Sequence, residues 1–282
     1  MAWNYKIMLD PNAGGTVDND DQTLTLATEY GTAGMFISTG GLSQELAYGI
    51  GANGTGSDFA SPMTTYLGYD VSSYSNVQYH TPAGLLPYGI MAKVAYVPNL
   101  SSSADSADFK TKGAQNNQDM GKTARMIMLS GSPIDGLNIS GDFFETESAL
   151  AKKSPSSANI AANYTIGSIK VGYGVGQQST ASAAAIAPVD YENEAYGIQF
   201  AVNDNLSVSY SEENYTSVTK ANIVSGASSG VKTEVESTID SVQVAYNVGG
   251  ATVGITRTEV KDSDYTKGND EEMTLFTLAM AF

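Results

Sequence analysis

The stretch Glu271-Glu272-Met273-Thr274-Leu275-Phe276-Thr277-Leu278-Ala279-Met280-Ala281-Phe282 decides the fold, because from Phe276 onward its side chains alternate in size. Large apolar side chains stand at every second position counted back from the last residue: Phe282, Met280, Leu278 and Phe276. The residues between them are small, and a period of two places the two sets on opposite faces of a β-strand. A soluble protein covers such a face with a second layer, whereas a membrane strand turns it to lipid and keeps its last aromatic at the membrane boundary. The segment is therefore the last strand of either a soluble β-sandwich or a transmembrane β-barrel.

Composition and charge exclude several classes of protein. The 282 residues carry 14 Lys and Arg against 30 Asp and Glu, and the formal net charge of −16 argues against nucleic acid as a partner. Cysteine is absent, which excludes disulfides, thiol chemistry and cysteine-based zinc sites. No run approaches the ~20 apolar residues of a membrane helix, so any crossing of a membrane must use strands. Met1 to Asn4 lead directly into an alternating segment with no signal peptide, so we expect a processed, engineered or incomplete amino terminus.

Alternating segments continue along the whole chain. About fourteen are predicted, close to the ~9–11 residues each that a tilted membrane strand requires. In 196–202 and 241–248, for example, large apolar residues alternate with Gly, Gln, Ser or Ala. The predicted connections alternate in length, with minimal ones at 203–205 and 249–250 and long ones at 176–190, 216–232 and 261–270. Bacterial barrels have this pattern of short turns and long outer loops. All the prolines fall in or beside predicted connections, as expected because proline cannot donate to a ladder.

The polar faces of these strands decide between sandwich and barrel. They carry Ser, Thr, Asn, Gln, Gly and Ala with scattered charges, while the apolar faces carry no charge. A sandwich has a dry core and a charged solvent face, whereas a wet interior and a hydrocarbon exterior explain both patterns. We therefore predict an all-β fold, an antiparallel transmembrane β-barrel forming one domain over residues 1–282. The alternative is a secreted adhesin built as a soluble β-sandwich, which would stay dispersed without detergent.

Two stretches give the chain a resemblance to the general porins of the Gram-negative outer membrane. One is the terminal strand with Phe276, Leu278, Met280 and Phe282, which looks like the signal that the outer-membrane assembly machinery reads. The other is 30–98, where a tight turn and a short strand precede a long loop and the segment 76–89, NVQYHTPAGLLPYG. The resemblance implies an outer-membrane location, passive diffusion of small hydrophilic solutes and ions, a homotrimer, and contact with lipid and lipopolysaccharide. It also implies that the long loop folds into the barrel and narrows it.

The chain departs from the family pattern in three ways. The usual Pro-Glu-Phe-Gly-Gly segment is missing, and Ser57-Asp58-Phe59-Ala60 resembles it only in part. The long loop is the second outer loop rather than the third, and about fourteen strands replace the family's ~16–18. We therefore expect that one amino-terminal hairpin is absent. Its absence would expose the edges of strands 3–9 and 271–282 unless those two strands pair with each other.

The loop 40–73 is the candidate constriction, because connections of this length are uncommon unless they are functional. It carries three acidic residues, Glu45, Asp58 and Asp70, no Lys or Arg, and many apolar residues that can pack on the lumen wall. The bases expected to face the lumen are Lys6, Lys93, Lys170, Lys122 and Arg125. The two sets would create a transverse field that favours dipolar solutes, and the excess of acids predicts a mild cation preference. The alternatives are an extracellular lid for the loop and an interfacial position for each base.

Catalytic and metal sites are only weakly indicated. His80 is the only histidine, and Asn76 and Gln78 beside it suggest an ordinary lumen position rather than a catalytic triad. Glu212 and Glu213 are interpreted as solvated acids beside a loop. The acidic outer stretches 18–21 and 262–272 could bind calcium, although neither has the spacing of a known calcium loop. We predict no catalysis, no cofactor and no metal site, with a substrate-specific channel as the nearest alternative function.

Overall fold

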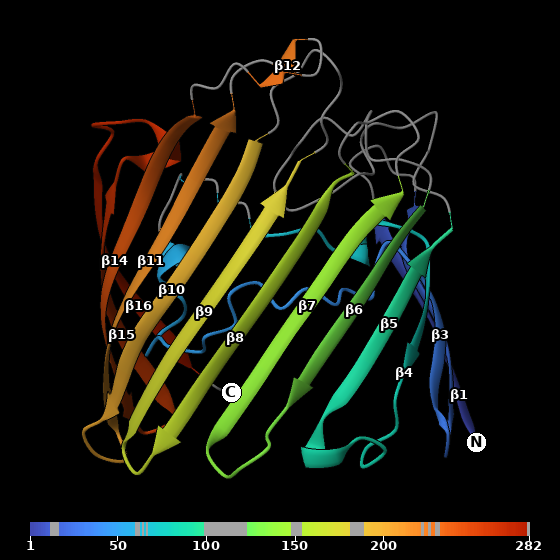
Figure 1. Ribbon diagram of the computed structural model, residues 1–282. Helices are drawn as coiled ribbons and strands as arrows, with labels where there is room; N and C mark the ends of the chain where they lie inside the picture. Colours follow the sequence, from blue (N-terminus) through green and yellow to red (C-terminus); the bar gives the residue numbers. More distant parts are fainter. Residues whose placement is uncertain are drawn as a thin grey trace.

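The computed structural model of the chain is a curved antiparallel sheet of 14 strands in its described part (Figure 1). The structure describes residues 1–11, 17–59, 63, 65, 67–98, 123–147, 154–180, 189–220, 223–224, 227–228 and 232–280. Each strand of the sheet pairs with its neighbours in chain order, so the sheet is a continuous meander. The predicted all-β barrel architecture is confirmed by this order and by the number of strands.

The strands of the sheet are β1 (Ala2–Pro11), β2 (Val17–Thr28), β3 (Gly31–Ile37), β4 (Asn76–His80), β5 (Met91–Val97), β6 (Thr123–Gly131), β7 (Leu137–Glu147), β8 (Ser156–Ile166), β9 (Ile169–Ser179), β10 (Val189–Ala201), β11 (Leu206–Lys220), β14 (Lys232–Val248), β15 (Ala251–Lys261) and β16 (Glu271–Met280). A separate ribbon pairs β12 (Ile223–Val224) with β13 (Ala227–Ser228). Short 3-10 helices are η1 (Gly56–Phe59), η2 (Val71–Ser73), η3 (Pro87–Gly89) and η5 (Ser263–Tyr265).

Short turns join the strands at one end of the sheet, the lower end in Figure 1. The turn between β14 and β15 consists of Gly249 and Gly250, whose φ angles are 56° and 88°. Two successive positive φ angles match the right-handed twist of a tight hairpin, and glycine adopts them without a steric penalty. The Gly-Gly pair in the sequence therefore dictates the shortest possible connection at this end.

The strands β1 and β16 are the two edges of the sheet. Among the described residues β1 pairs only with β2, and β16 pairs only with β15. The direct pairing of the first and last strands, one of the two arrangements considered from the sequence, is therefore not observed. The sheet curves around an interior that the segment between β3 and β4 crosses (Figure 1).

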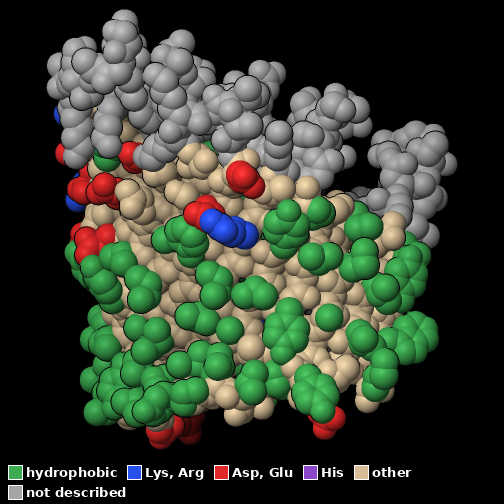
Figure 2. Space-filling view, turned by 45° about the vertical axis from the view of Figure 1, so that its right-hand side comes forward, with side chains coloured by type: hydrophobic (Ala, Val, Ile, Leu, Met, Phe, Trp, Pro, Cys, Tyr) green, Lys and Arg blue, Asp and Glu red, His purple; other side chains and the backbone are tan. Residues whose placement is uncertain are grey.

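The two faces of the sheet differ in polarity. On β14, Val242 and Val248 are exposed on the convex face, whereas Ser241 and Gln243 are buried on the concave face. Figure 2 shows hydrophobic side chains spread over the convex wall, with acidic and basic side chains among them in its upper part and further acidic side chains at its lower edge. A single layer with its polar face turned inward contradicts the soluble β-sandwich. No helix in the described residues has the length and hydropathy of a membrane span.

The last strand has the orientation that its alternation predicts. Phe276, Leu278 and Met280 lie on the convex face and are 72%, 63% and 55% exposed. Their neighbours across the ladder on β15 are Ile255, Val253 and Ala251, so the apolar face continues onto the next strand. Phe282 lies outside the described residues.

The predicted acidic loop at 18–21 is wrong, because these residues belong to β2. Asp18 pairs with Asp10 of β1, and a bulge separates this pairing from that of Ile7 with Gln22. A strand that rises beyond the apolar band is held by its backbone ladder and needs no apolar side chain. Hydrophobic alternation therefore predicts a loop for this acidic part of the strand.

Candidate pore constriction

The described residues of the segment 38–75, which are 38–59, 63, 65 and 67–75, lie inside the sheet and pack on its concave wall through two apolar clusters. The first joins Leu42, Tyr69, Val71 and Tyr74 of the segment to side chains of β5, β6 and β7: Ala95, Val97, Ala124, Met126, Met128 and Phe144. The second joins Leu46, Tyr48 and Ile50 to Ala195, Tyr215, Ile239 and Val260. Burying one large apolar side chain contributes roughly 1.5–3 kcal/mol, so these clusters hold the segment firmly in place. The predicted long loop folded into the lumen is confirmed.

Hydrogen bonds fix the tip of this segment to β14 and β15, far from its origin at β3. The backbone N of Asn53 donates to Gln243 Oε1 at 2.7 Å. The side-chain amide Asn53 Nδ2 donates to three oxygens of the wall, Val244 O, Ile255 O and Thr256 Oγ1, at 3.0 to 3.2 Å. These contacts carry the segment across the interior, from one side of the sheet to the other.

Glu213 on β11 receives the densest set of hydrogen bonds from the segment and is 1% exposed. The hydroxyls of Tyr48 and Tyr215 each donate to its carboxylate at 2.5 Å. The backbone N of Gly56 donates at 2.7 Å and that of Ser57 at 3.3 Å. Burial, and then the charge of Glu213, raise the pKa of Tyr48, so this phenol is a neutral donor. Glu213 is a buried anchor of the loop tip, and the prediction that it is a solvated acid is wrong.

A second carboxylate of the wall holds the near part of the segment. Asp142 on β7 accepts from the backbone N of Gln44 at 2.6 Å. The side chain of Asn159 on β8 donates to both oxygens of Asp142 at 3.2 Å. Asp142 therefore has donors from the loop and from the wall, which satisfies a buried charge that would otherwise be costly.

Two of the three predicted loop acids maintain the shape of the loop itself. Asp70 accepts from Leu42 N at 2.8 Å and from Val71 N at 2.6 Å, and so caps η2. Asp58 accepts from the backbone N and the hydroxyl of Thr55 at 3.0 and 2.6 Å. These contacts orient the carboxylates, since a carboxylate with two donors has few free rotamers.

Glu45 and Asp58 lie around one cavity of about 340 Å³, together with Glu213. The other lining residues include Tyr48 and Tyr215, and no Lys or Arg is among them. Asp70 is not part of this lining, so the structure brings together two of the three predicted acids and adds one from the barrel wall. Three carboxylates without a base give the cavity a negative potential.

Three of the predicted bases face the concave side. Lys6 pairs in the ladder with Thr23, and Lys93 pairs with His80, on the same face as the buried Gln78. Lys170 lies under the loop, where a Cβ built on Gly49 would stand 3.2 Å from its Nζ. Lys122 lies outside the described residues.

The prediction that Arg125 lines the lumen is wrong. Its ladder neighbours are Tyr96 and Glu145, and it forms an ion pair with Glu145 on the convex face. On the concave face of β6 stand Ala124, Met126 and Met128, which the loop covers. Both faces of β6 are therefore largely apolar, and alternation alone could not assign them.

The sequence reasoning missed the anchors Glu213, Asp142, Asn53 and Gln243. The sequence did contain a signal for Glu213. Val208 and Tyr210 are apolar or aromatic and share the even numbering of Glu212, so the period of two along β11 turns Glu212 outward with them and Glu213 inward. No local signal marks Asn53, because its partners lie about 190 residues further along the chain.

Comparison with known proteins places the fold. No protein-family model and no curated protein matches the sequence. Among solved structures, the anion-selective porin from Comamonas acidovorans has a TM-score of 0.62 at 12% identity, over 96% of this chain and 80% of that chain. The outer membrane channel DcaP of Acinetobacter baumannii has a TM-score of 0.59 at 10% identity, over 98% and 79%.

Salmonella typhi OmpF, in complex with daunomycin, has a TM-score of 0.56 at 12% identity, over 94% of this chain and 79% of that chain. Identities this low establish a common fold and not a common specificity. With its 14-stranded meander, its apolar convex face and its inward loop, this chain has the outer-membrane β-barrel fold of the porins.

Proposed function

We propose that this protein is an outer-membrane channel for the passive diffusion of small hydrophilic solutes and ions. The observation that carries the proposal is the loop 40–73, docked across a polar concave wall by Asn53 and Glu213. Such a loop leaves only part of the cross-section open to water, and pore radius and lining charge then select the solute. The apolar convex face fits lipid, and a membrane further requires that the edges β1 and β16 are covered.

The charges around the loop support a mild cation preference. Glu45, Asp58 and Glu213 surround the loop cavity, while Lys93 and Lys170 stand on the wall. The acids and bases lie on different elements, which is the arrangement expected for a transverse field across a narrowing. The fold itself does not set selectivity, because one of the similar structures is an anion-selective porin.

Planar bilayer recording tests both parts of the proposal. The purified protein should form water-filled channels whose current rises linearly with salt concentration. In a potassium chloride gradient the reversal potential should have the sign of a cation-preferring pore. Absence of conductance from a folded, heat-modifiable barrel would overturn the channel function, and anion selectivity would overturn only the cation preference.

A substrate-specific channel is the second candidate, and the carboxylate-lined cavity favours it. A general pore shows no saturation, whereas a solute that occupies the cavity should reduce the conductance with a saturable dependence on its concentration. Titration with small organic cations, with matched neutral solutes as the control, separates the two.

Further partners follow from the porin-like fold and belong to the same proposal. We expect a homotrimer, insertion by the outer-membrane assembly machinery through the strand with Phe276 and Leu278, and contact with lipopolysaccharide. We propose no enzymatic role, and His80, the only histidine, contacts Gln78 Oε1 through Nε2 at 2.7 Å on the wall. The described residues contain no group of three or more His, Asp or Glu placed to hold a metal ion, and calcium at the acidic stretches 18–21 and 262–272 stays a prediction.

A further inference from the structure

The convex wall has a notch where β6, β7 and β8 run side by side. In the pairing across these strands, Gly141 on β7 stands between Leu129 on β6 and Ile160 on β8. Because Gly141 has no side chain, the apolar layer is interrupted between two large side chains. The result is a cavity of about 370 Å³, within the size range of ligand pockets. The large side chains around it, each between 39% and 57% exposed, are Ile127, Leu129, Ile139, Phe143 and Ile160.

The close approach of β7 and β8 keeps this notch open. A Cβ built on Gly141 would stand 2.8 Å from the backbone oxygen of Asn159, so the strand pair leaves no room for a side chain there. The polar residues of the lining alternate with the apolar ones and face the concave side. The carboxylate of Asp142, for example, accepts from Gln44 N at 2.6 Å and from Asn159 Nδ2 at 3.2 Å. Apolar side chains therefore set the chemistry of the notch.

The notch lies near the lower end of the sheet. Gly141 is four residues above Leu137, the first residue of β7. With a rise of ~3.4 Å per residue and a tilt of ~35–45°, this places it ~10–11 Å above the turn. One leaflet supplies about half of a ~30 Å hydrocarbon core, so the notch lies within a single leaflet. The short turns of bacterial barrels face the periplasm, and the notch therefore opens into the periplasmic leaflet.

The short connections at this end, here called the lower rim, carry acids and no bases. They are 29–30, 81–90, 132–136, 167–168, 202–205 and 249–250, and their charged residues are Glu29, Asp135 and Asp204. All three are exposed, and none has a hydrogen-bond or ion-pair partner within the described part of the chain. Figure 2 shows acidic side chains at the lower edge of the wall. The lower rim therefore presents carboxylates that lack a counter-charge to the lipid headgroups.

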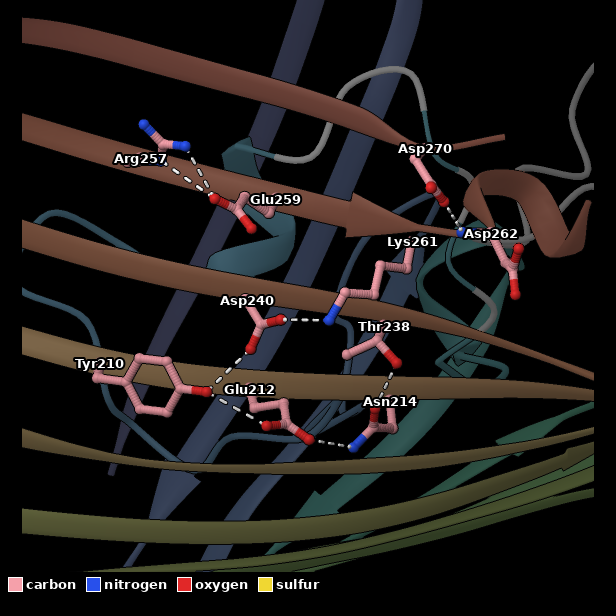
Figure 3. Close-up of polar contacts among 10 residues, drawn as sticks. All are labelled: Tyr210, Glu212, Asn214, Thr238, Asp240, Arg257, Glu259, Lys261, Asp262 and Asp270. Carbon is pink, nitrogen blue, oxygen red and sulfur yellow. Dashed lines mark hydrogen bonds and ion pairs between the residues drawn. The ribbon is translucent and has the colours of Figure 1, made fainter. Parts of the chain in front are cut away.

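The acids higher on the convex wall differ, because their own neighbours compensate them (Figure 3). Glu212 accepts from Tyr210 OH at 3.2 Å and from Asn214 Nδ2 at 3.1 Å. Asp240 accepts from Tyr210 OH at 2.9 Å and lies 3.4 Å from Lys261 Nζ. A cation from outside the protein is therefore favoured at the lower rim and not at these positions.

Asp135 connects the two features. Pro133, two residues before it in the same turn, lines the notch. We propose that the notch and Asp135 form one binding site for an aminophospholipid of the periplasmic leaflet. One acyl chain fills the space over Gly141, and the ammonium group of the headgroup donates to the carboxylate of Asp135.

The headgroup chemistry distinguishes between phospholipids. Phosphatidylethanolamine combines an acyl chain with an ammonium that has three N–H donors, whereas the quaternary ammonium of phosphatidylcholine has none. Phosphatidylglycerol has no cation and would place its phosphate beside Asp135, where the like charges repel. The site requires that the convex face meets lipid, and it does not depend on conduction.

Native mass spectrometry of the folded protein tests the proposal. The protein is incubated in detergent with equal amounts of phosphatidylethanolamine, phosphatidylcholine and phosphatidylglycerol that have the same acyl chains. We expect one phosphatidylethanolamine retained per chain, with a preference of roughly fivefold over phosphatidylglycerol, the effect of one strong exposed ion pair. Equal retention of the three lipids, or a preference for phosphatidylglycerol, would overturn the proposal.

Variants of the lower rim test the headgroup contact. Asp135→Asn should abolish the preference for phosphatidylethanolamine without lowering the retention of phosphatidylglycerol. Asp204→Asn removes an equally exposed acid from a different turn and is the matched control, so its preference should stay at the parent value. The same change in both variants would refute a specific role for Asp135.

Variants of the notch test the acyl contact. Ile160→Trp should fill the notch and lower the retention of all three lipids alike. Ile198→Trp makes the same exchange at an outward, 45% exposed position on β10 and should leave retention unchanged. If Ile160→Trp does not fold, Leu129→Phe fills the notch from β6. Unchanged retention in a folded notch variant would contradict the proposal.

A second copy of the chain is the other possible occupant of the notch. The chain has no cysteine, so Ile160→Cys creates a single site for a short bifunctional maleimide. A covalent dimer formed in lipid vesicles would place a second copy over the notch and overturn the lipid site. Bilayer conductance of the same samples keeps the proposals distinct: a selectively retained lipid without conductance would refute the channel alone, and conductance without lipid preference would refute the lipid site alone.

Discussion

Replacing Glu213 by alanine should release the tip of the inward loop without unfolding the barrel. The change removes the one acceptor shared by Tyr48 OH, Tyr215 OH, Gly56 N and Ser57 N. Three of these donors, Tyr48, Gly56 and Ser57, belong to the loop. Hydrogen bonds to a charged group contribute ~1.5–3 kcal/mol each, but bonds that share one carboxylate are not additive. We take ~3 kcal/mol for the set, and since ~1.4 kcal/mol is a factor of ten, the released population of the tip should rise ~100-fold.

Single-channel recording measures this release. The Glu213→Ala channel should show greater open-channel noise and a higher mean conductance than the parent, because a mobile tip obstructs the lumen less. Glu213→Gln should lie between the two, since its amide oxygen still accepts from the backbone of Gly56. The temperature at which the gel band shifts should fall only slightly, because the strand ladder is untouched.

The adjacent residue supplies a matched control. Glu212 has the same chemistry as Glu213 but faces the convex surface, where it accepts from Tyr210 and Asn214. Glu212→Ala should therefore leave the noise and the conductance at parent values. Equal effects from the two substitutions, or no effect from Glu213→Ala, would refute the argument that Glu213 holds the loop.

The remaining predictions concern the same loop and its surroundings. Asn53→Ala removes the side-chain hydrogen bonds to β14 and β15 but keeps the bond from its backbone N to Gln243, and it should raise the current noise further when combined with the loss of the Glu213 anchor. Gly172→Ala places a Cβ 2.1 Å from the backbone oxygen of Tyr48, so it should push the loop off the wall and change the conductance. Lys93→Glu should shift the reversal potential further toward cation preference. Burial raises the pKa of Tyr69 from 10.0 to about 12, so its contribution to stability is complete below pH 10 and is lost between about pH 10 and 12, which melting curves across this range would detect.

The fold could be predicted because its main signal is local. In β14 and β16 the period of two alone shows which side chains face out, and the exposures of Val242 and Phe276 agree with it. Nearly every strand has water on its inner face and an apolar phase on its outer face. The same alternation of polar and apolar side chains is therefore expected on each strand, and this one rule predicts the orientation of most of the sheet. The rule fails on β6, where the loop makes the inner face apolar and hides the true orientation of Arg125.

The site could be predicted only in part because its contacts are remote in sequence. The acids Glu45 and Asp58 were predicted from the composition of the loop. The residues that hold the loop belong to strands that lie much further along the sequence. Tyr48 and Glu213 are separated by 165 positions, and Asn53 and Gln243 by 190. Alternation along one strand states which face a residue occupies and says nothing about which distant segment covers that face.

The neighbouring residues Glu212 and Glu213 show how the two solvents divide the chemistry of one strand. On β11 the odd positions Ser211, Glu213 and Tyr215 are buried toward the loop, while the even positions Tyr210 and Glu212 face the convex surface, where Tyr210 OH donates to Glu212. A slip of one residue in the pairing of β11 would exchange the two faces. It would place Glu213, the anchor of the loop, on the convex surface and Glu212 under the loop. Because the inner anchor needs four donors and the outer acid needs neighbours on adjacent strands, both contact sets are lost together in the slipped register. The pair of adjacent carboxylates therefore specifies the register of β11 together with the apolar residues below it.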